Sequence, residues 1–401
     1  MLFPGRLSQL PQGSFAKLAL LTDGVPPGDL MREEGPINLA VGDPRGEVPV
    51  FVSEALAAHG HEFGRYPPIN GTDEWRQAAR GWLKRRFGAE LAEDQVLPLN
   101  GSREGLFLAP QIVTPEEKGG GRPVILLPNP FYQCYAAAIL AAGAEPVYVP
   151  ARAEYGFLPD FASLSVAVLS RTVAAYFCSP SNPEGAVAGE AYWQTLFALA
   201  DAYDFTVFAD ECYADIYLDT PPLGALQVRR PPYERLLSFH SLSKRSALPG
   251  LRSGMVTGCP TLMARFRALR NYAGPQVPLP IQSASAACWN DEEHVRSNRA
   301  AYQERFEVAE EVLGHLPGFN LPKGGFFLWL EVGDGEAAAL KLWREAGVMV
   351  LPGAFMGRAI VSGKTRTNPG FSYIRVALVN DLSTIRAALV KIGFVLGDQK
   401  P

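Results

Sequence analysis

The chain has 401 residues, of which 47% are hydrophobic and 10% aromatic, the composition of an ordinary folded protein that is long enough for two cores. Lys and Arg total 37 against 41 for Asp and Glu, so the formal net charge is -4, and no long block of one sign favours nucleic acid or an anionic membrane as a partner. No apolar run approaches the roughly 18 residues of a membrane span, and the N-terminus lacks the layout of a secretory signal, which predicts a cytoplasmic protein.

The five cysteines are far apart in the sequence, and none belongs to a C-x-x-C pair. Neither a disulfide framework nor a zinc site is therefore indicated. The five histidines likewise show no metal-ligand spacing, and we expect no metal site.

The middle of the chain alternates short apolar runs with longer helical patterns, as parallel strands joined by crossover helices do. The expected strands are 95–99, 123–127, 145–149, 172–178, 206–209, 236–241 and 254–258. Helical periodicity covers 103–113, 132–142 and 189–203. These elements predict an α/β fold with a mostly parallel sheet and flanking helices, whose sites lie beyond the carboxyl ends of the strands.

A smaller α+β domain is expected towards the C-terminus. The run 279–316 is long and amphipathic in stretches, and we expect it to leave the sheet domain. The second domain is then expected to hold strands at 325–332, 348–352 and 373–378, with helices at 336–346 and 382–392. We expect a large domain at 46–284 and a small domain that combines 285–401 with an N-terminal arm at 1–45.

Candidate site residues follow each of the first two strands of the predicted sheet. Ser102 and Arg103 open a helix directly after the strand 95–99, and the free backbone N–H groups of such a helix start form a ready phosphate site. A purely structural N-cap serine is the alternative, and the two interpretations are compatible. Tyr132 follows the next strand and could stack on a heteroaromatic ring, although a lone aromatic residue is more commonly part of a core.

Asn182 and Asp210 each follow an apolar strand. Asn182 precedes a proline, which holds it extended and fixes the direction of its amide, so that it could donate to a phenolic oxygen; a plain Asn-Pro turn is the alternative. Asp210 follows the strand 206–209, where a carboxylate can keep a pyridine nitrogen protonated, and Tyr213 could bond to the phenolic oxygen of the same ring. The alternative for Asp210 is a cap of the next helix.

Lys244 lies in the string Ser241-Leu242-Ser243-Lys244-Arg245-Ser246. Its amine can condense with an aldehyde as a Schiff base, while Ser241, Ser243 and Arg252 offer hydroxyl groups and a planar cation to a phosphate. A phosphorylated aldehyde held by both ends suggests pyridoxal phosphate. A surface turn rich in Ser and Gly is the alternative.

Arg375 is a charged residue inside the apolar strand 373–378, where burial is costly unless an anion meets the guanidinium. The carboxylate of an amino-acid substrate could be that anion, bound through two parallel hydrogen bonds. A structural ion pair with an acid of the core is the alternative, and the sequence pattern leaves both open.

Taken in chain order, these pieces resemble the fold-type I, pyridoxal-phosphate-dependent aminotransferases of class I/II over nearly the whole chain. The resemblance rests on Gly42 in Asn38–Pro44, Tyr66 in Arg65–Pro68, Gly71–Arg76, Asn100–Arg103, Tyr132, Asn182 with Pro183 and Gly185, Asp210 with Tyr213, Ser241–Lys244, Arg252 and Arg375. It implies a homodimer in which Tyr66 reaches the phosphate of the neighbouring subunit's site. It also implies that Gly42, Asn182 and Arg375 bind the substrate, and that Lys244 acts as general base and acid after its Schiff base opens.

Within the family, the phrases at 66–68, 97–104, 129–133 and 241–246 look like the subfamily that acts on succinyldiaminopimelate in lysine biosynthesis. The expected reaction moves nitrogen between N-succinyl-LL-2,6-diaminopimelate and 2-oxoglutarate. Other class I/II aminotransferases, with aspartate, aromatic or broad specificity, and a C–S lyase of the same fold are the alternatives. Two residues depart from the pattern, because Glu184 replaces a small residue and Ala247 stands where the subfamily tends to carry Asn. The candidates for binding a distal carboxylate are Arg45, Arg65, Arg103, Arg245 and Arg358.

Overall fold

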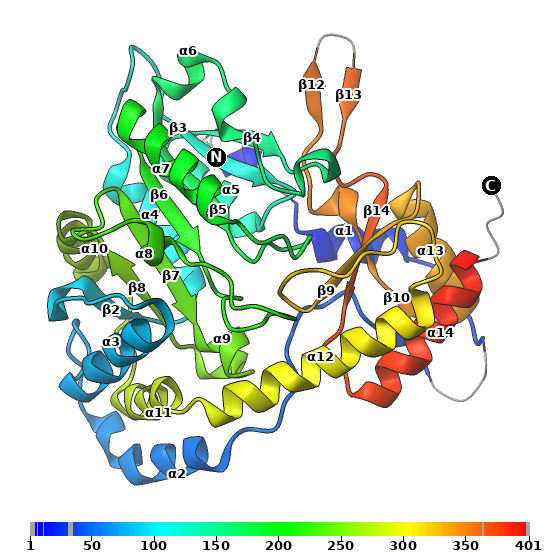
Figure 1. Cartoon of the computed structure of the whole chain (residues 1–401), viewed down its shortest axis with the longest axis horizontal. Helices are drawn as coiled ribbons and strands as arrows, with labels where there is room; N and C mark the ends of the chain where they lie inside the picture. Colours follow the sequence, from blue (N-terminus) through cyan, green and yellow to red (C-terminus); the bar gives the residue numbers. More distant parts are fainter. Residues whose placement is uncertain (1–4, 6, 11, 31–34, 363–364, 398–401) are drawn as a thin grey trace.

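A computed structural model describes residues 5, 7–10, 12–30, 35–362 and 365–397 (Figure 1). A seven-stranded sheet with the order β2-β8-β7-β6-β5-β3-β4 forms its main body. The strands are β2 (Val96–Leu99), β3 (Val124–Asn129), β4 (Glu145–Pro150), β5 (Thr172–Cys178), β6 (Thr206–Asp210), β7 (Leu236–Ser241) and β8 (Gly254–Gly258). Only β8 runs antiparallel to its neighbours, which confirms the predicted α/β fold with a mostly parallel sheet.

The central strands β5, β6 and β7 are buried along their whole length. Alternate side chains enter two different cores, since Phe177 and Val207 belong to one and Tyr176 and Phe208 to the other. Burial on both faces explains why β5 and β6 read as nearly continuous apolar runs in the sequence, whereas β7 also buries Ser238, His240 and Ser241. The flanking helices are α3 (Asp73–Phe87), α4 (Ser102–Val113), α5 (Gln133–Ala141), α6 (Val166–Leu169), α7 (Glu190–Tyr203), α8 (Ala225–Val228) and α10 (Pro260–Ala273).

The expected strands of the main sheet lie close to those observed. Three of them, 172–178, 236–241 and 254–258, coincide with β5, β7 and β8. The strand β3 continues to residue 129, two residues beyond the predicted end at 127. The helices predicted at 103–113, 132–142 and 189–203 correspond to α4, α5 and α7 with one-residue differences at their ends.

A second, three-stranded antiparallel sheet has the order β11-β14-β9, with β9 (Phe327–Glu331), β11 (Leu351–Pro352) and β14 (Tyr373–Ala377). The short strand β1 (Ile37–Asn38) pairs in parallel with β10 (Val348–Met349) and brings the N-terminal segment to this body. The single strand predicted at 348–352 is therefore wrong, because β10 and β11 pair with different partners. Helix α13 (Gly335–Ala346) begins one residue before the predicted helix at 336–346, and α14 (Leu382–Gly397) continues five residues beyond the predicted end at 392. The antiparallel pair β12 (Ile360–Ser362) and β13 (Thr365–Thr367) was not expected.

The run predicted at 279–316 consists of two helices, α11 (Leu279–Asn290) and α12 (Glu293–Leu313). The first packs against α2 (Val50–His59) and α3 beside the main sheet, whereas α12 reaches across the molecule to α14 (Figure 1). The domain boundaries at residues 46 and 285 stay a prediction. Residue 285 lies within α11, and we propose that the second boundary falls instead at the break between the two helices, at 291–292. Helix α1 (Ser14–Leu21) packs against β11 of the smaller sheet.

No helix in the described part of the chain is long and apolar enough to cross a membrane.

Candidate active site

Many of the expected site residues lie at the carboxyl ends of the parallel strands of the main sheet. Asp210 is the last residue of β6, Asn182 follows β5, and Tyr132 follows β3. Ser241 ends β7 and leads into the short helix α9 (Leu242–Arg245), which carries Lys244. Parallel strands place their carboxyl ends at the same edge of a sheet, so residues that are far apart in sequence meet there.

Lys244 lies in α9, whose first turn is capped because the Ser241 hydroxyl accepts a hydrogen bond from the backbone N–H of Ser243 at 3.2 Å. Its Nζ donates to the carbonyl oxygen of Gly42 at 2.8 Å and lies 6.0 Å from the ring centroid of Tyr213. Burial lowers the pKa of Lys244 from 10.5 to about 8. The uncharged amine, which is the nucleophilic and basic form, is therefore accessible near neutral pH.

The Asp210 carboxyl is only 3% exposed. Its Oδ2 accepts a hydrogen bond from the Tyr135 hydroxyl at 2.5 Å, and its Oδ1 accepts one from the backbone N–H of Cys212 at 3.3 Å. Burial raises the pKa of Asp210 above its ordinary value, and the two hydrogen bonds oppose that rise. The structure thus presents a buried acid at the strand end, and a cation against it would favour its charged form.

Tyr135 is a site residue that the sequence reasoning missed. It lies in α5, three residues after Tyr132, and the two rings meet edge to face with their centroids 5.5 Å apart. Residues three apart share one face of a helix, so this spacing was the signal that could have found it. The phenol of Tyr132 accepts a hydrogen bond from the Arg103 guanidinium, and burial raises the pKa of Tyr132 to about 12.

A cradle of donors lies where α4 begins. Gly101 has a φ of 82°, and a Cβ there would come within 2.5 Å of the Arg252 guanidinium, so this close approach requires glycine. Arg252 donates to the carbonyl oxygen of Asn100 at 2.9 Å. The first N–H groups of a helix have no partner within it, and here they lie beside a guanidinium, with Ser102 and Arg103 as the first residues of α4. This donor set suits a phosphate.

Arg375 is 4% exposed, and its guanidinium joins the two sheets. Nη1 donates to Oδ1 of Asn182 at 2.9 Å, and Nη2 donates to the carbonyl oxygen of Ala40 at 2.7 Å. The guanidinium also lies 4.3 Å from the ring centroid of Phe327.

No carboxylate among the described residues lies within ion-pair distance of Arg375, and its Nε has no hydrogen-bond partner there. Of the two interpretations left open above, the structural ion pair is therefore not found in the described part of the chain. Burial lowers the pKa of Arg375 to about 10, which still leaves it charged at neutral pH. A buried cation without a counter-ion is suited to an anionic ligand.

The candidate arginines for a second carboxylate have different environments. Arg245 is not available, because its buried guanidinium forms ion pairs with Asp215 and Glu292, each at 2.9 Å. Arg65 pairs with Glu62 at 2.5 Å. Arg45 lines a pocket of about 350 Å³ together with Ser246 and Ala247, which follow Lys244 in the sequence.

Arg103 bonds to Tyr132 as described, and the backbone N–H of Arg358 donates to Oδ1 of Asn129 at 2.8 Å, at the end of β3. Tyr66 is fully exposed in the single chain. Its role in a neighbouring subunit stays a prediction.

Ala247 has a φ of 51°, a left-handed conformation that is unfavourable for alanine. We expect Ala247→Gly to raise the free energy of unfolding by about 0.5–1 kcal/mol, since glycine adopts this conformation freely but loses more entropy on folding. Denaturant unfolding of the cofactor-free protein measures the change. The matched control is Ala300→Gly on the exposed face of α12, which should lower stability by about 1 kcal/mol. Equal losses in both variants would contradict the strain at Ala247.

Comparisons with known proteins agree with this arrangement. The sequence profile of the family described as aminotransferase class I and II matches residues 34–374. The 4-dedimethylamino-4-oxo-anhydrotetracycline transaminase OxyQ of Streptomyces rimosus is 32% identical over 363 residues, which cover 90% of this chain and 93% of that protein. The LL-diaminopimelate aminotransferase of Syntrophobacter fumaroxidans is 30% identical over 89% of this chain and 90% of its own length. Among solved structures, an aminotransferase from Neisseria meningitidis has a TM-score of 0.92 at 40% identity, and the match covers 98% of this chain and 100% of the other.

Proposed function

Because the chain belongs to the class I and II aminotransferases, which use pyridoxal 5'-phosphate, we propose that it transfers nitrogen from N-succinyl-LL-2,6-diaminopimelate to 2-oxoglutarate. The observation that carries the proposal of an amino-acid substrate is the buried Arg375, which has no counter-ion among the described residues. The subfamily phrases in the sequence and a diaminopimelate aminotransferase among the relatives support the choice of amino donor. Lysine and diaminopimelate biosynthesis is the pathway that this reaction would serve.

The residues at the sheet edge fit the cofactor. The phosphate would be held by the backbone N–H groups of Ser102 and Arg103 and by the side chains of Ser241, Ser243 and Arg252. Asp210 would face the ring nitrogen, Asn182 and Tyr213 the phenolic oxygen, and Tyr132 the face of the ring. When bound, the cofactor supplies an electron sink that allows the substrate to lose a proton from its α carbon.

The side chains have separate tasks in this proposal. Arg375 would bind the α-carboxylate of the substrate and so fix the direction of its α C–H bond. Lys244 would take the α proton with its Nζ, and its lowered pKa suits a base that works near neutral pH. The Nδ2 of Asn182 would be able to donate to the cofactor, because the Oδ1 already accepts from Arg375.

We also propose that the enzyme is a cytoplasmic homodimer in which Tyr66 completes the phosphate site of the second subunit. Full exposure of this aromatic side chain in the single chain supports the proposal. The exposed ring is free to contact a second subunit.

Free LL-diaminopimelate is the second candidate donor. It is favoured by the similarity to the protein from Syntrophobacter fumaroxidans, which is named an LL-diaminopimelate aminotransferase. The two donors differ at the end of the side chain that is remote from the reaction. One carries a free ammonium group there, and the other carries a succinylated nitrogen.

We expect the purified enzyme to use N-succinyl-LL-diaminopimelate at least about tenfold faster than aspartate or aromatic amino acids, with 2-oxoglutarate as the acceptor. A tenfold preference corresponds to a difference of about 1.4 kcal/mol in the free energy with which the enzyme binds the two side chains. Comparison of kcat/KM for the succinylated donor, the free donor, aspartate and phenylalanine tests this. Equal or inverted values would move the assignment to another specificity of the family. Release of pyruvate and ammonia from a β-thio amino acid such as cystathionine, without an acceptor, would indicate a C–S lyase.

A further inference from the structure

The helix that carries Lys244 has only one turn. Helix α9 covers Leu242–Arg245, and a single turn of helix has little stability of its own. The last backbone carbonyl groups of a helix also lack partners within it. The orientation of Lys244 therefore depends on the groups that meet α9 from other elements.

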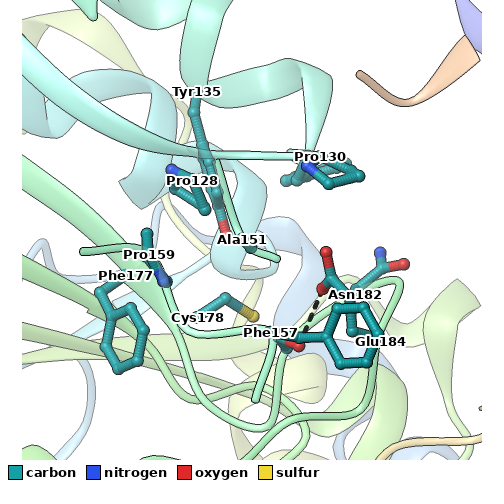
Figure 2. A pocket seen from close by; sticks show the side chains of 12 residues that line it. Pro128, Pro130, Tyr135, Ala151, Phe157, Pro159, Phe177, Cys178, Asn182 and Glu184 are labelled. Carbon is teal, nitrogen blue, oxygen red and sulfur yellow. Dashed lines mark hydrogen bonds between the residues drawn. The ribbon is translucent and has the colours of Figure 1, made fainter. Parts of the chain in front are cut away.

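The small cavity beside Asn182 does not supply these groups. Figure 2 shows its lining, which includes Tyr135, Asn182 and Glu184 but not Lys244. Its volume of about 10 Å³ leaves room for roughly one water molecule. The pocket of about 350 Å³, in contrast, is lined by Ser246, two residues after Lys244, and by several residues of α12. Helix α12 thus borders the turn that carries Lys244.

Asn298 on α12 meets the end of α9. Its Nδ2 donates to the carbonyl oxygen of Lys244 at 3.2 Å and to that of Arg245 at 3.1 Å. An amide nitrogen carries two hydrogens, so one side chain can serve both carbonyl groups. The Oδ1 atom could not take this place, because it would face two other oxygens. Asn298 therefore caps the C-terminal end of α9 from a different element.

Few other donors reach these two carbonyl groups. The carbonyl oxygen of Lys244 also accepts from the backbone N–H of Ala247, at the longer distance of 3.4 Å. The carbonyl oxygen of Arg245 accepts only from Asn298 among the described residues. Loss of the amide would therefore free the last carbonyl group of α9 completely.

A second residue of α12 contacts the same turn. The Nε2 of His294 lies 2.8 Å from the hydroxyl oxygen of Ser246. His294 and Asn298 are four residues apart and so lie on one face of the helix. Because α12 continues to α14 in the smaller body, one helix connects that body with the turn of Lys244 (Figure 1).

We propose that Asn298 is a positioning residue, which fixes the backbone of α9 and so directs the amine of Lys244 towards the aldehyde of the cofactor. The direction of a side chain follows from the orientation of its helix. Since the Nζ lies at the far end of a long side chain, a small tilt of α9 displaces it more than it displaces the backbone. This inference rests on the proposed role of Lys244.

The test replaces Asn298 by Ala and by Asp, with Gln303→Ala as the matched control. Gln303 is half-buried on the same helix, as Asn298 is, and its Nε2 donates to the carbonyl oxygen of Leu218 at 2.6 Å. The control therefore loses the same kind of bond, but not one to α9. Alanine favours a helix, and the adjoining pocket lets water reach the freed carbonyl groups. Both alanine variants should therefore fold, with similar small losses of stability in denaturant unfolding.

The first measurement needs no turnover. When pyridoxal phosphate is added to cofactor-free protein, the lysine-linked absorbance should form about tenfold more slowly in Asn298→Ala than in the wild type. Gln303→Ala should match the wild type.

The second measurement is the half-reaction of the loaded enzyme with glutamate. Its maximal rate should fall about 10- to 100-fold in Asn298→Ala, because the base is misplaced. The glutamate concentration that gives half of this rate should stay within about threefold of the wild type, since Arg375 is unchanged.

Asn298→Asp separates the hydrogen-bond donor from the shape of the side chain. A carboxylate has nearly the shape of the amide, but it has no hydrogen to donate and would face two carbonyl oxygens. Asn298→Asp should therefore be at least as slow as Asn298→Ala in both measurements. Wild-type rates in Asn298→Asp would mean that packing, and not the two hydrogen bonds, places Lys244.

The inference and the proposed role of Lys244 fail separately. If Asn298→Ala forms the lysine-linked absorbance at the wild-type rate, or if Gln303→Ala is slowed as much, Asn298 has only a structural role and the inference is wrong. Loss of folding in Asn298→Ala but not in Gln303→Ala would contradict it as well. If the wild type itself forms no lysine-linked absorbance, the role of Lys244 is wrong.

Discussion

Replacement of Lys244 by Ala is expected to lower the rate of transamination by about 10⁴-fold or more, because it removes both the amine that binds the aldehyde and the general base. The groups that its Nζ contacts are no substitute, since neither the carbonyl oxygen of Gly42 nor the ring of Tyr213 can condense with an aldehyde. Steady-state rates and the visible absorbance of the lysine-linked cofactor measure the loss. An active Lys244→Ala variant with an unchanged spectrum would remove Lys244 from the mechanism.

Two controls separate catalysis from folding. Lys244→Arg keeps the positive charge but not a titratable amine, so it should be as inactive as Lys244→Ala. Lys244→Met removes a buried amine whose pKa is lowered to about 8. Between pH 8 and 10.5 the folded wild type binds fewer protons than the unfolded chain and gains stability as the pH rises. The free energy of unfolding of cofactor-free Lys244→Met should therefore exceed that of the wild type by the largest amount below pH 8. This difference should shrink towards pH 10.5.

Asp210→Asn is expected to lower kcat/KM by roughly 10³-fold, because loss of one partner from a buried, hydrogen-bonded charge pair costs about 2–5 kcal/mol. The amide has nearly the shape of the carboxylate and can keep the hydrogen bond from the backbone of Cys212. The variant therefore tests the charge rather than the packing. The measurement is kcat/KM with glutamate, together with the affinity of the variant for pyridoxal phosphate.

Tyr135→Phe is the matched control for this experiment. It removes only the hydrogen bond from the phenol to the Asp210 carboxylate, which is worth about 1.5–3 kcal/mol, so a loss of roughly 10- to 150-fold, smaller than that of Asp210→Asn, is expected. If both variants lose the same activity, the hydrogen-bond network and not the charge of Asp210 carries the effect. If neither loses activity, Asp210 does not face the cofactor.

The main sheet could be predicted from the sequence because its central strands are buried on both faces. Residues 172–178 form a nearly continuous apolar run, and 236–241 alternate apolar and polar residues after two leucines. The smaller sheet was harder to predict, since β10 and β11 have two residues each and their pairing depends on β1 and β14, which are distant in sequence. Strands this short have no periodicity of their own.

The site was predictable where residues follow strands, as Asn182, Asp210 and Lys244 do. Parallel topology then brings them to one edge without any knowledge of side-chain contacts. Contacts between elements could not be predicted. The bond from Tyr135 to Asp210 and the ion pairs that exclude Arg245 as a carboxylate ligand depend on how helices pack on the sheet.

The bonds of Arg375 also bear on how the protein responds to its ligand. Its guanidinium holds together β14, the segment after β1 and the loop after β5. A guanidinium has five N–H donors, so a carboxylate bound to Arg375, as proposed, would share this group with Asn182 and Ala40. Binding would thus be thermodynamically linked to how the smaller sheet is held against the larger one, and the affinity for each substrate would depend on that linkage.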